Sequence, residues 1–205
     1  MYERTDAKKL NDLFLPMGRR NPRGVYFARV CGGGDGVSDA LWAFHEAARQ
    51  KGVVIEGQIG NPDERQLSYL NETLGTAFEA NEAFIVNALD RWMPRMQPER
   101  RREFARALCA QFDELRRQGK TDSILRNIYF KVMCWLYYKF ERLMPFLGDD
   151  EPPRVLYECP GITGHELILL RILNGMGADI LLFAHEPAIG AVFQHEVGRL
   201  FRIAV

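Results

Sequence analysis

Residues 25–59 run VYFARVCGGGDGVSDALWAFHEAARQKGVVIEGQI, and this stretch decides the fold class. VYFARV is apolar enough to predict a strand, and a glycine-rich turn follows it. The next segment has the i, i+3, i+7 spacing of a buried helical face at Leu41, Phe44 and Ala48. Gly52 ends that helix, and VVIEGQI predicts a second strand. So short a strand-helix-strand unit implies a crossover between parallel strands.

A second unit of the same layout occupies residues 154–184. RVLYECP predicts a strand, GITGHELILLRILNGMG a loop with a helix and a glycine stop, and DILLFAHEP another strand. The two units match in layout and not in residues. Together they predict an α/β fold in which Rossmann-like strand-helix-strand units form a mostly parallel sheet.

Between these units the apolar pattern is helical throughout. Helices are predicted over 78–93, from Pro98 to Gly119, and over 123–144, and they form an all-helical insertion. The outer face of the middle helix, ERRRE and ELRRQ, is strongly charged. A solvated face is the simpler interpretation of these charges, and an acidic partner is the alternative.

The chain is therefore expected to contain four regions. They are an N-terminal helix and basic turn (1–24), a first strand-helix-strand unit (25–77), the helical insertion (78–148) and a second such unit (149–205).

The two ends of the chain have features of their own. The basic turn MGRRNPRG near the N-terminus is interpreted as a solvated surface. The C-terminal segment is apolar and has no helix cap, which predicts a longer native chain.

Composition excludes several functional classes. Lys plus Arg and Asp plus Glu number 27 each, so no net field attracts nucleic acid or anionic lipid. The N-terminus has no apolar leader, and the run 128–140 is too short for about 20 residues of bilayer. We therefore expect a cytoplasmic protein that neither binds nucleic acid nor inserts into a membrane. The four cysteines show no CxxC or zinc spacing, so no metal site is predicted.

The glycine-rich turn is the first candidate site. Backbone N–H groups of such a turn can hold a phosphate at a helix N-terminus, and an acid near the end of the second strand, here Glu56, completes the dinucleotide pattern. The pattern is partial, because Asp35 brings a negative charge into the turn and Asp39 stands where the third glycine belongs. A tight turn capped by Asp35 or Ser38 is the alternative.

The second loop offers another candidate group. Thr163 and Glu166 have capping-box spacing, which accounts for both side chains without a ligand. His165 lies between them, near the sheet edge where ligands of open α/β sheets bind. With His185, Glu158, Glu186 and Cys159 it forms a group suited to acid–base chemistry or metal binding, for which chance clustering at strand ends is the alternative. No complete catalytic constellation is visible, so no catalytic residue is assigned.

Two blocks resemble a known family: YFARVCGGGDGVSDALWAFHEAARQKGVVIEGQIGNP and PPRVLYECPGITGHELILLRILNGMGADILLFAHEP. They are similar to the bacterial YceG-type family, described as a component of a biosynthetic module and unrelated to the lytic transglycosylase of that name. The resemblance is carried most by Pro153, Arg154 and Tyr157, by Glu166, and by Gly177 with Asp179. It implies a context beside tellurite and toxic-anion stress-resistance proteins of the Ter and Tel groups, and supplies no catalytic residues.

Two functions remain open on this evidence. The first is a component of such a stress-resistance or biosynthetic module that binds a nucleotide, sugar phosphate or other anionic metabolite, with or without enzymatic activity. The second is a non-catalytic assembly protein that docks Ter/Tel-type partners through the helical insertion. Neither cofactor nor reaction follows from the sequence. The expected ligand-binding residues are Gly32, Gly33, Gly34, Asp35, Gly36, Ser38, Glu56, Glu158, His165 and Glu166.

Overall fold

The computed structural model describes residues 2–5, 7, 10–20, 23–31, 37–158, 161–183 and 202–204. It has a mixed α/β fold and divides into two compact units. Unit 1 consists of residues 1–59 and 146–205, and unit 2 consists of residues 60–145. Each unit is described by itself below.

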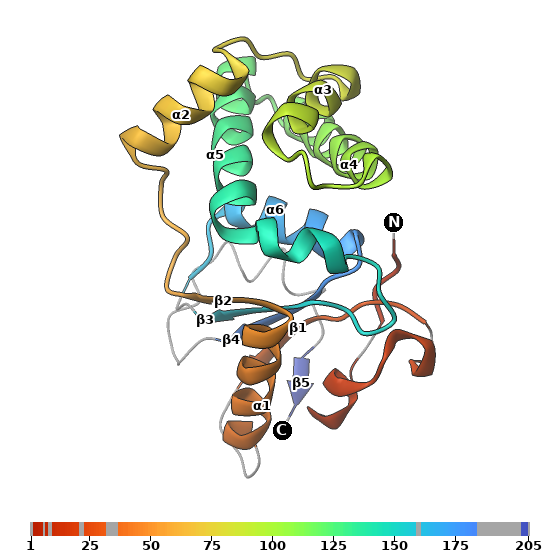
Figure 1. Ribbon diagram of the computed structural model, residues 1–205. Coiled ribbons are helices and arrows are strands. Elements are labelled where there is room, and N and C mark those ends of the chain that lie inside the picture. The colour runs from red at the N-terminus through yellow and green to blue at the C-terminus, as the bar shows by residue number, and fades with distance from the viewer. Residues whose placement is uncertain are drawn as a thin grey trace. The chain divides into compact units, whose positions relative to one another are not determined.

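Unit 1 is built on a parallel sheet with strand order β2-β3-β4-β1-β5 (Figure 1). All the pairs are parallel, as the sequence predicts. β1 and β2 belong to one strand-helix-strand unit, yet β4 and β3 lie between them in the sheet. The strands are β1 (Phe27–Cys31), β2 (Gly52–Glu56), β3 (Arg154–Glu158), β4 (Asp179–Phe183) and β5 (Arg202–Ala204).

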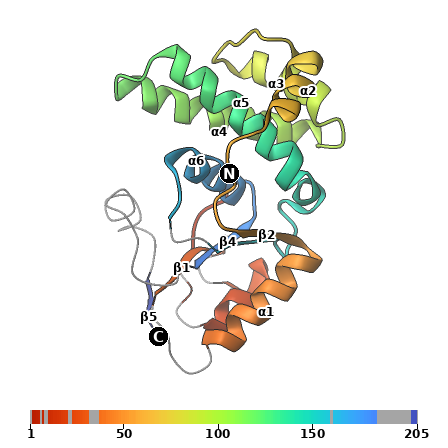
Figure 2. The same cartoon turned by 90° about the vertical axis from the view of Figure 1, so that its left-hand side faces the viewer.

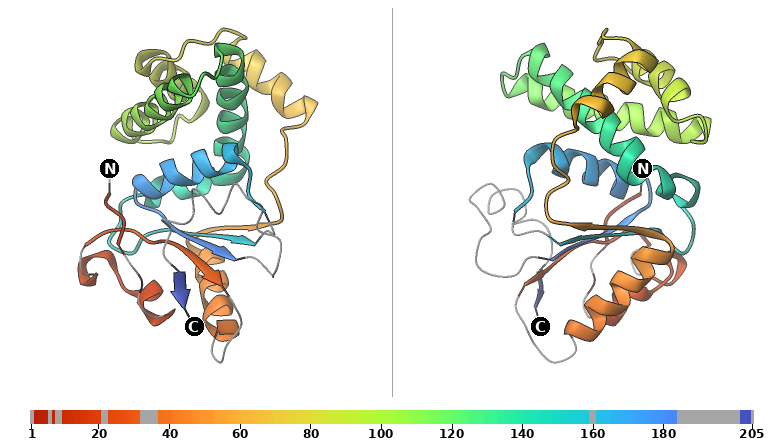
Figure 3. Two further views of the ribbon diagram at one scale, coloured as in Figure 1. Left: turned by 180° about the vertical axis from the view of Figure 1, so that it is seen from behind. Right: turned by 60° about the vertical axis from the view of Figure 1, so that its left-hand side comes forward.

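One helix covers each face of this sheet (Figures 2 and 3). The helix α1 (Val37–Gln50) follows β1, and α6 (Gly164–Gly175) follows β3. Gly52 stands where α1 gives way to β2, and a Cβ there would lie 1.9 Å from the carbonyl oxygen of Arg154. Only glycine therefore lets β2 pair with β3 directly after the helix.

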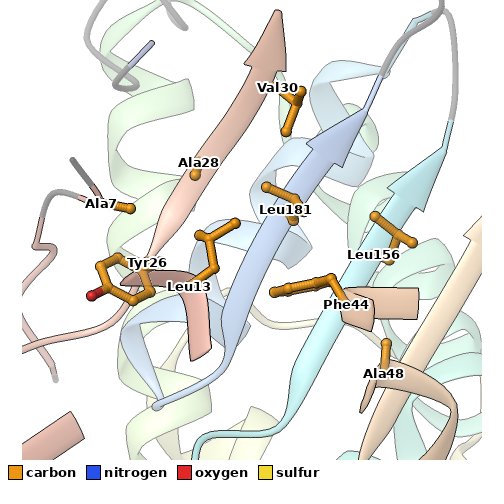
Figure 4. Close-up of a cluster of buried hydrophobic side chains, with 9 residues drawn as sticks. All are labelled: Ala7, Leu13, Tyr26, Ala28, Val30, Phe44, Ala48, Leu156 and Leu181. Carbon is orange, nitrogen blue, oxygen red and sulfur yellow. The ribbon is translucent and has the colours of Figure 1, made fainter. Parts of the chain in front are cut away.

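Apolar side chains of α1 and alternate strand residues form a core cluster (Figure 4). Phe44 is 1% exposed and Ala48 is fully buried, so the prediction that they face the core is confirmed. Residues two apart on a strand share a face, so the strand members of this cluster mark the face toward α1. The cluster consists of Ala7, Leu13, Tyr26, Ala28, Val30, Phe44, Ala48, Leu156 and Leu181.

The described elements of unit 2 are helices. The predicted helices leave out residues 63–77, where Asp63 and Gln66 form a capping box and Leu70 and Leu74 are buried in a helix. The last predicted helix ends at Phe140, and a 3₁₀-helix over Glu141–Phe146 follows because Pro145 cannot continue an α-helix. The helices are α2 (Glu64–Leu74), α3 (Glu82–Trp92), α4 (Pro98–Arg117) and α5 (Asp122–Phe140). No helix of the described chain is long and apolar enough to cross a membrane.

The charged face of α4 is balanced within unit 2. Arg101 donates to Asp90 and to the carbonyl of Pro94, and Arg116 donates to Asp122 at 2.9 Å. Other arginines pair along the helix with acids three residues away, and Arg106 pairs with Glu82 of α3. The pairs along the helix are Arg100 with Glu103, Arg102 with Glu99, Arg116 with Asp113, and Arg117 with Glu114.

A buried ion pair joins the N-terminal segment to the sheet. The side chains of Arg20 and Asp179 are both fully buried, and their closest N–O distance is 2.6 Å. Arg20 also donates to the carbonyls of Leu15 and Gly24, while Asp179 accepts the backbone N–H of Tyr26 at 2.9 Å. The interpretation of the basic turn as solvated surface is therefore wrong for Arg20. A single charge in such a position cannot be recognised from sequence, because its partner is 159 residues away.

Removing the charge of Asp179 tests how much this ion pair contributes to the free energy of unfolding. Asp179→Asn leaves the buried Arg20 without a counter-charge, so we expect it to lower the free energy of unfolding by about 3–5 kcal/mol. Urea denaturation measures the loss. The control is Asp149→Asn, which removes a half-exposed partner of Lys51 and should cost less than about 1 kcal/mol. Equal losses in the two variants would contradict a dominant role for the buried pair.

Candidate functional site

The carboxyl ends of the parallel strands form one edge of the sheet in unit 1. β1 ends at Cys31, β2 at Glu56, β3 at Glu158 and β4 at Phe183. Both α1 and α6 begin at this edge, because each follows a strand that ends there (Figure 1). The edge therefore combines strand ends with the positive ends of two helix dipoles.

The strand order creates a switch point at this edge. From β1 the chain passes through α1 to β2 at one end of the sheet, whereas from β4 it leads to β5 at the other end. β4 and β1 are adjacent, in register from Phe27 with Ile180 to Val30 with Phe183. Connections that diverge from neighbouring strands leave a crevice between them, where ligands of open α/β sheets bind.

The glycine-rich turn connects to this point of the sheet. Gly32, Gly33, Gly34, Asp35 and Gly36 lie outside the described residues, between Cys31 at the end of β1 and Val37 at the start of α1. Ser38 is the second residue of α1 and is exposed. It therefore stands inside the first turn, so the alternative that made it the N-cap is wrong.

Glu56 and Glu158 are brought together in register at the ends of β2 and β3. They share a face with Val54 and Leu156, which contact the cluster below α1. The strand β1 is farther away, because β2 stands three strand spacings from it, or about 14 Å. The dinucleotide pattern needs its acid on a strand beside the first one. Glu56 does not occupy that position here.

Glu166 is held by backbone groups. It is 1% exposed, and the predicted capping box with Thr163 is confirmed. Its Oε2 accepts the N–H of Thr163 at 2.7 Å, and its Oε1 accepts the N–H of Ile59 at 2.7 Å. The second contact, over 107 residues, could not be read from the spacing. Glu166 thus ties the start of α6 to the segment that leaves β2.

The remaining members of the expected acid–base group are only partly described. His165 follows Gly164 at the start of α6 and is partly buried. Cys159, His185 and Glu186 lie outside the described residues, so their grouping stays a prediction. In the described ranges, no three His, Cys, Asp or Glu side chains gather closely enough to hold a metal ion.

The two described thiols are held in their protonated form. Burial, followed by the charges of Glu82 and Asp113, raises the pKa of Cys109 to about 11. Burial raises the pKa of Cys134 to about 12, with a smaller effect of Asp63. A thiol is nucleophilic only as its thiolate, so neither side chain is poised for covalent chemistry near neutral pH.

The chain combines a parallel α/β sheet, with a switch point at its carboxyl edge, and a unit whose described elements are helices. A family model described as the YceG domain matches residues 68–189, more than half of the chain. The chain therefore belongs to the YceG domain family, and the resemblance to a YceG-type family is confirmed. The match includes Glu158, His165 and Glu166, whereas β1 and the glycine-rich turn precede it. No match was found among curated proteins or among solved structures.

Because Glu166 accepts two backbone N–H groups, removing its side chain should cost more stability than removing an ordinary helix cap. Glu166→Ala leaves the N–H groups of Ile59 and Thr163 without their acceptor, so we expect a loss of about 2 kcal/mol or more in the free energy of unfolding. Thr163→Ala is the control and removes one cap contact, worth about 1 kcal/mol. Urea denaturation compares them. If Glu166→Ala costs no more than the control, the Ile59 contact contributes nothing.

The raised pKa of Cys109 predicts slow alkylation with a steep pH dependence. Below pH 11 the thiolate fraction rises about tenfold per pH unit, so labelling by iodoacetamide should accelerate equally. Peptide mass spectrometry measures labelling of Cys109 by itself. The urea-unfolded chain is the control and should label much faster at pH 8. Equal native and unfolded rates would show that the thiol is not protected.

Proposed function

We propose that this protein binds an anionic metabolite at the carboxyl edge of its sheet, in the crevice between the ends of β4 and β1. The strand order supports this proposal, because β1, which the glycine-rich turn follows in the sequence, lies beside β4 where the two connections diverge. A Rossmann-like use of the turn follows: its backbone N–H groups and the N-terminus of α1 would receive the negative group.

The carboxylates of Glu56 and Glu158 narrow the ligand class. As acceptors they suit hydroxyl groups and not phosphate oxygens. They stand two and three strand spacings from β1, about 10 to 14 Å away. A ligand that reaches from the end of β1 to these two carboxylates needs an anionic end and a hydroxyl-bearing end. This favours a nucleotide or a sugar phosphate over a bare inorganic anion.

The biological setting of this activity belongs to the proposal as well. We place the protein in the cytoplasm, as a component of a bacterial tellurite or toxic-anion stress-resistance system or of an associated biosynthetic module. Ter/Tel-type proteins are its expected neighbours. The described residues present no complete set of catalytic groups, so the proposal is limited to ligand binding and names no reaction.

The pairing of charges on α4 weighs against the assembly alternative. A docking surface for an acidic partner presents positive charge that is not already neutralised. Here the arginines of ERRRE and ELRRQ lie beside carboxylates of the same unit, from Arg100 with Glu103 to Arg117 with Glu114. The charged face is therefore better explained as a solvated surface, and ligand binding is the function that we prefer.

A thermal-shift screen against nucleotides, sugar nucleotides, sugar phosphates and inorganic phosphate tests the proposal. We expect a nucleotide or sugar phosphate to raise the melting temperature of the chain by several degrees, as ligand at about 100 times its Kd adds about 2.7 kcal/mol. Gly34→Val should abolish that rise, because a branched side chain blocks the approach of the phosphate to the backbone.

Gly161→Ala is the matched control at the other loop of the same edge. A Cβ at Gly161 meets no atom within 4 Å, so the variant should fold and keep the ligand response. A ligand response that survives Gly34→Val would refute the glycine-rich turn as the binding element. A folded chain that responds to no compound of the screen would refute the proposed ligand class.

A further inference from the structure

The strand β2 leaves one side of its backbone without a neighbouring strand. It is the first strand in the order β2-β3-β4-β1-β5, so β3 pairs with its inner side only. Among the described residues the one isolated bridge joins Arg4 to Val25 and does not involve β2. Over Gly52–Glu56, β2 is therefore an edge strand of the sheet.

Two hydrogen bonds show which residues of β2 direct their backbone outward. The carbonyl of Lys51 accepts the N–H of Arg154 at 3.0 Å, and the N–H of Gly57 donates to the carbonyl of Glu158 at 2.7 Å. Backbone groups of successive residues point to opposite sides of a strand, so the odd-numbered residues of this segment face β3. The N–H and C=O of Val54 therefore point away from the sheet.

This outer side of β2 carries backbone groups that can pair with another strand. In the described part of the chain neither backbone group of Val54 has a hydrogen-bond partner, and Glu56 directs its own groups to the same side. Edge strands are protected by a lysine, a proline or an inward charge. The stretch Gly52–Ile55 contains none of these, so its edge is open to a further strand.

We infer that β2 pairs in antiparallel fashion with β2 of a second copy of this chain, across a two-fold axis at Val54. The outward groups recur at every second residue, so two such strands match in register. Val54 then exchanges both of its hydrogen bonds with its own copy, and Glu56 stands opposite Gly52. Such a contact is self-complementary and closes after two copies. It is independent of ligand binding.

The side chains at this junction favour the same pairing. Val54 is half-buried against the cluster below α1, and pairing with its copy covers the exposed part. On the other face of the sheet Val53 stands opposite Ile55 of the second copy. Cross-strand pairs of β-branched side chains stabilise a sheet. The junction is therefore apolar on both faces.

The charges of the chain do not oppose association of two copies. Its formal net charge is zero, so no net field keeps the copies apart. The two Glu56 positions lie two residues on either side of the axis, which places them about 14 Å from each other. Because five residues of each strand bury less surface than a standard interface, we expect a dimer whose population depends on concentration.

Analytical ultracentrifugation of the whole chain between about 1 and 200 µM tests this pairing. We expect the mass to rise with concentration from the 23.6 kDa of one chain towards twice that value. Val54→Pro removes an N–H that points away from β3, so β2 keeps its bonds to β3 while the central pair of the interface is lost. The dissociation constant of the dimer should rise about tenfold or more.

Val54→Thr is the matched control. It keeps the N–H and the branched shape of the side chain, so this variant should form the dimer as the native chain does. Val54→Lys sets like charges opposite each other across the axis and should also prevent pairing. It replaces Val54→Pro if circular dichroism shows that the latter does not fold.

Cysteine cross-linking tests the register of the two strands. Val54→Cys places two thiols across a hydrogen-bonded antiparallel pair, where the Cα atoms are about 5.5 Å apart, a distance that a disulfide spans. Under mild oxidation we expect a disulfide between these two positions, which peptide mass spectrometry distinguishes from links of the four native cysteines. Glu72→Cys, at an exposed position of α2, is the control and should form no such link.

The outcomes decide the inference by themselves. A dimer that is lost in Val54→Pro, kept in Val54→Thr and linked through Val54→Cys supports it. A chain that keeps the mass of one copy at the highest concentration overturns it. A dimer of unchanged affinity in Val54→Pro and Val54→Lys also overturns it, because the contact then lies elsewhere. Ligand binding is tested separately by Gly34→Val and stands or falls without this result.

Discussion

The ion pair between Arg20 and Asp179 is the constraint on which unit 1 depends. Both side chains are removed from water, so each needs the other and the surrounding carbonyl and N–H groups to remain charged. Asp179 opens β4 and accepts the N–H of Tyr26 just before β1. Asn174 reinforces the same corner through the carbonyls of Tyr26 and Ala178. The pair thereby fixes β1 beside β4.

That adjacency has a consequence at the other end of the strands. Because β1 is inserted between β4 and β5, the chain leaves β1 and β4 in opposite directions. Such diverging connections mark the position where ligands of open α/β sheets bind. A buried charge pair at the amino edge thus helps to set the strand order on which our proposed site depends, without touching that site.

Charge is balanced over the whole chain and distributed unevenly within it. In unit 2 the arginines of α4 neutralise acids of the same unit, which leaves a solvated surface. In unit 1 Glu56 and Glu158 stand side by side at the ends of β2 and β3, three and two strands away from β1. A net charge of zero therefore excludes a global field and says nothing about local sites.

The sequence by itself determined the local elements of this protein. Apolar spacing placed Phe44 and Ala48 in the core and predicted parallel strands on either side of α1 and α6. The capping-box spacing of Thr163 and Glu166 marked the start of a helix. These features depend on residues within a few positions of each other. The helix α2 was missed, although its capping box and its buried leucines gave the usual signals. The short strand β5 was missed too, because the apolar residues of the C-terminal segment favoured a helix.

The tertiary structure decided what depends on distant partners. It buried Arg20 against Asp179, gave Glu166 a second contact at Ile59, and put β3 and β4 between β1 and β2. It also brought Arg4 close enough to Arg171 for their charges to interact. Strand order and charge pairing are set by burial free energy summed over the whole unit, because contacts between residues over 100 positions apart leave no spacing in the sequence.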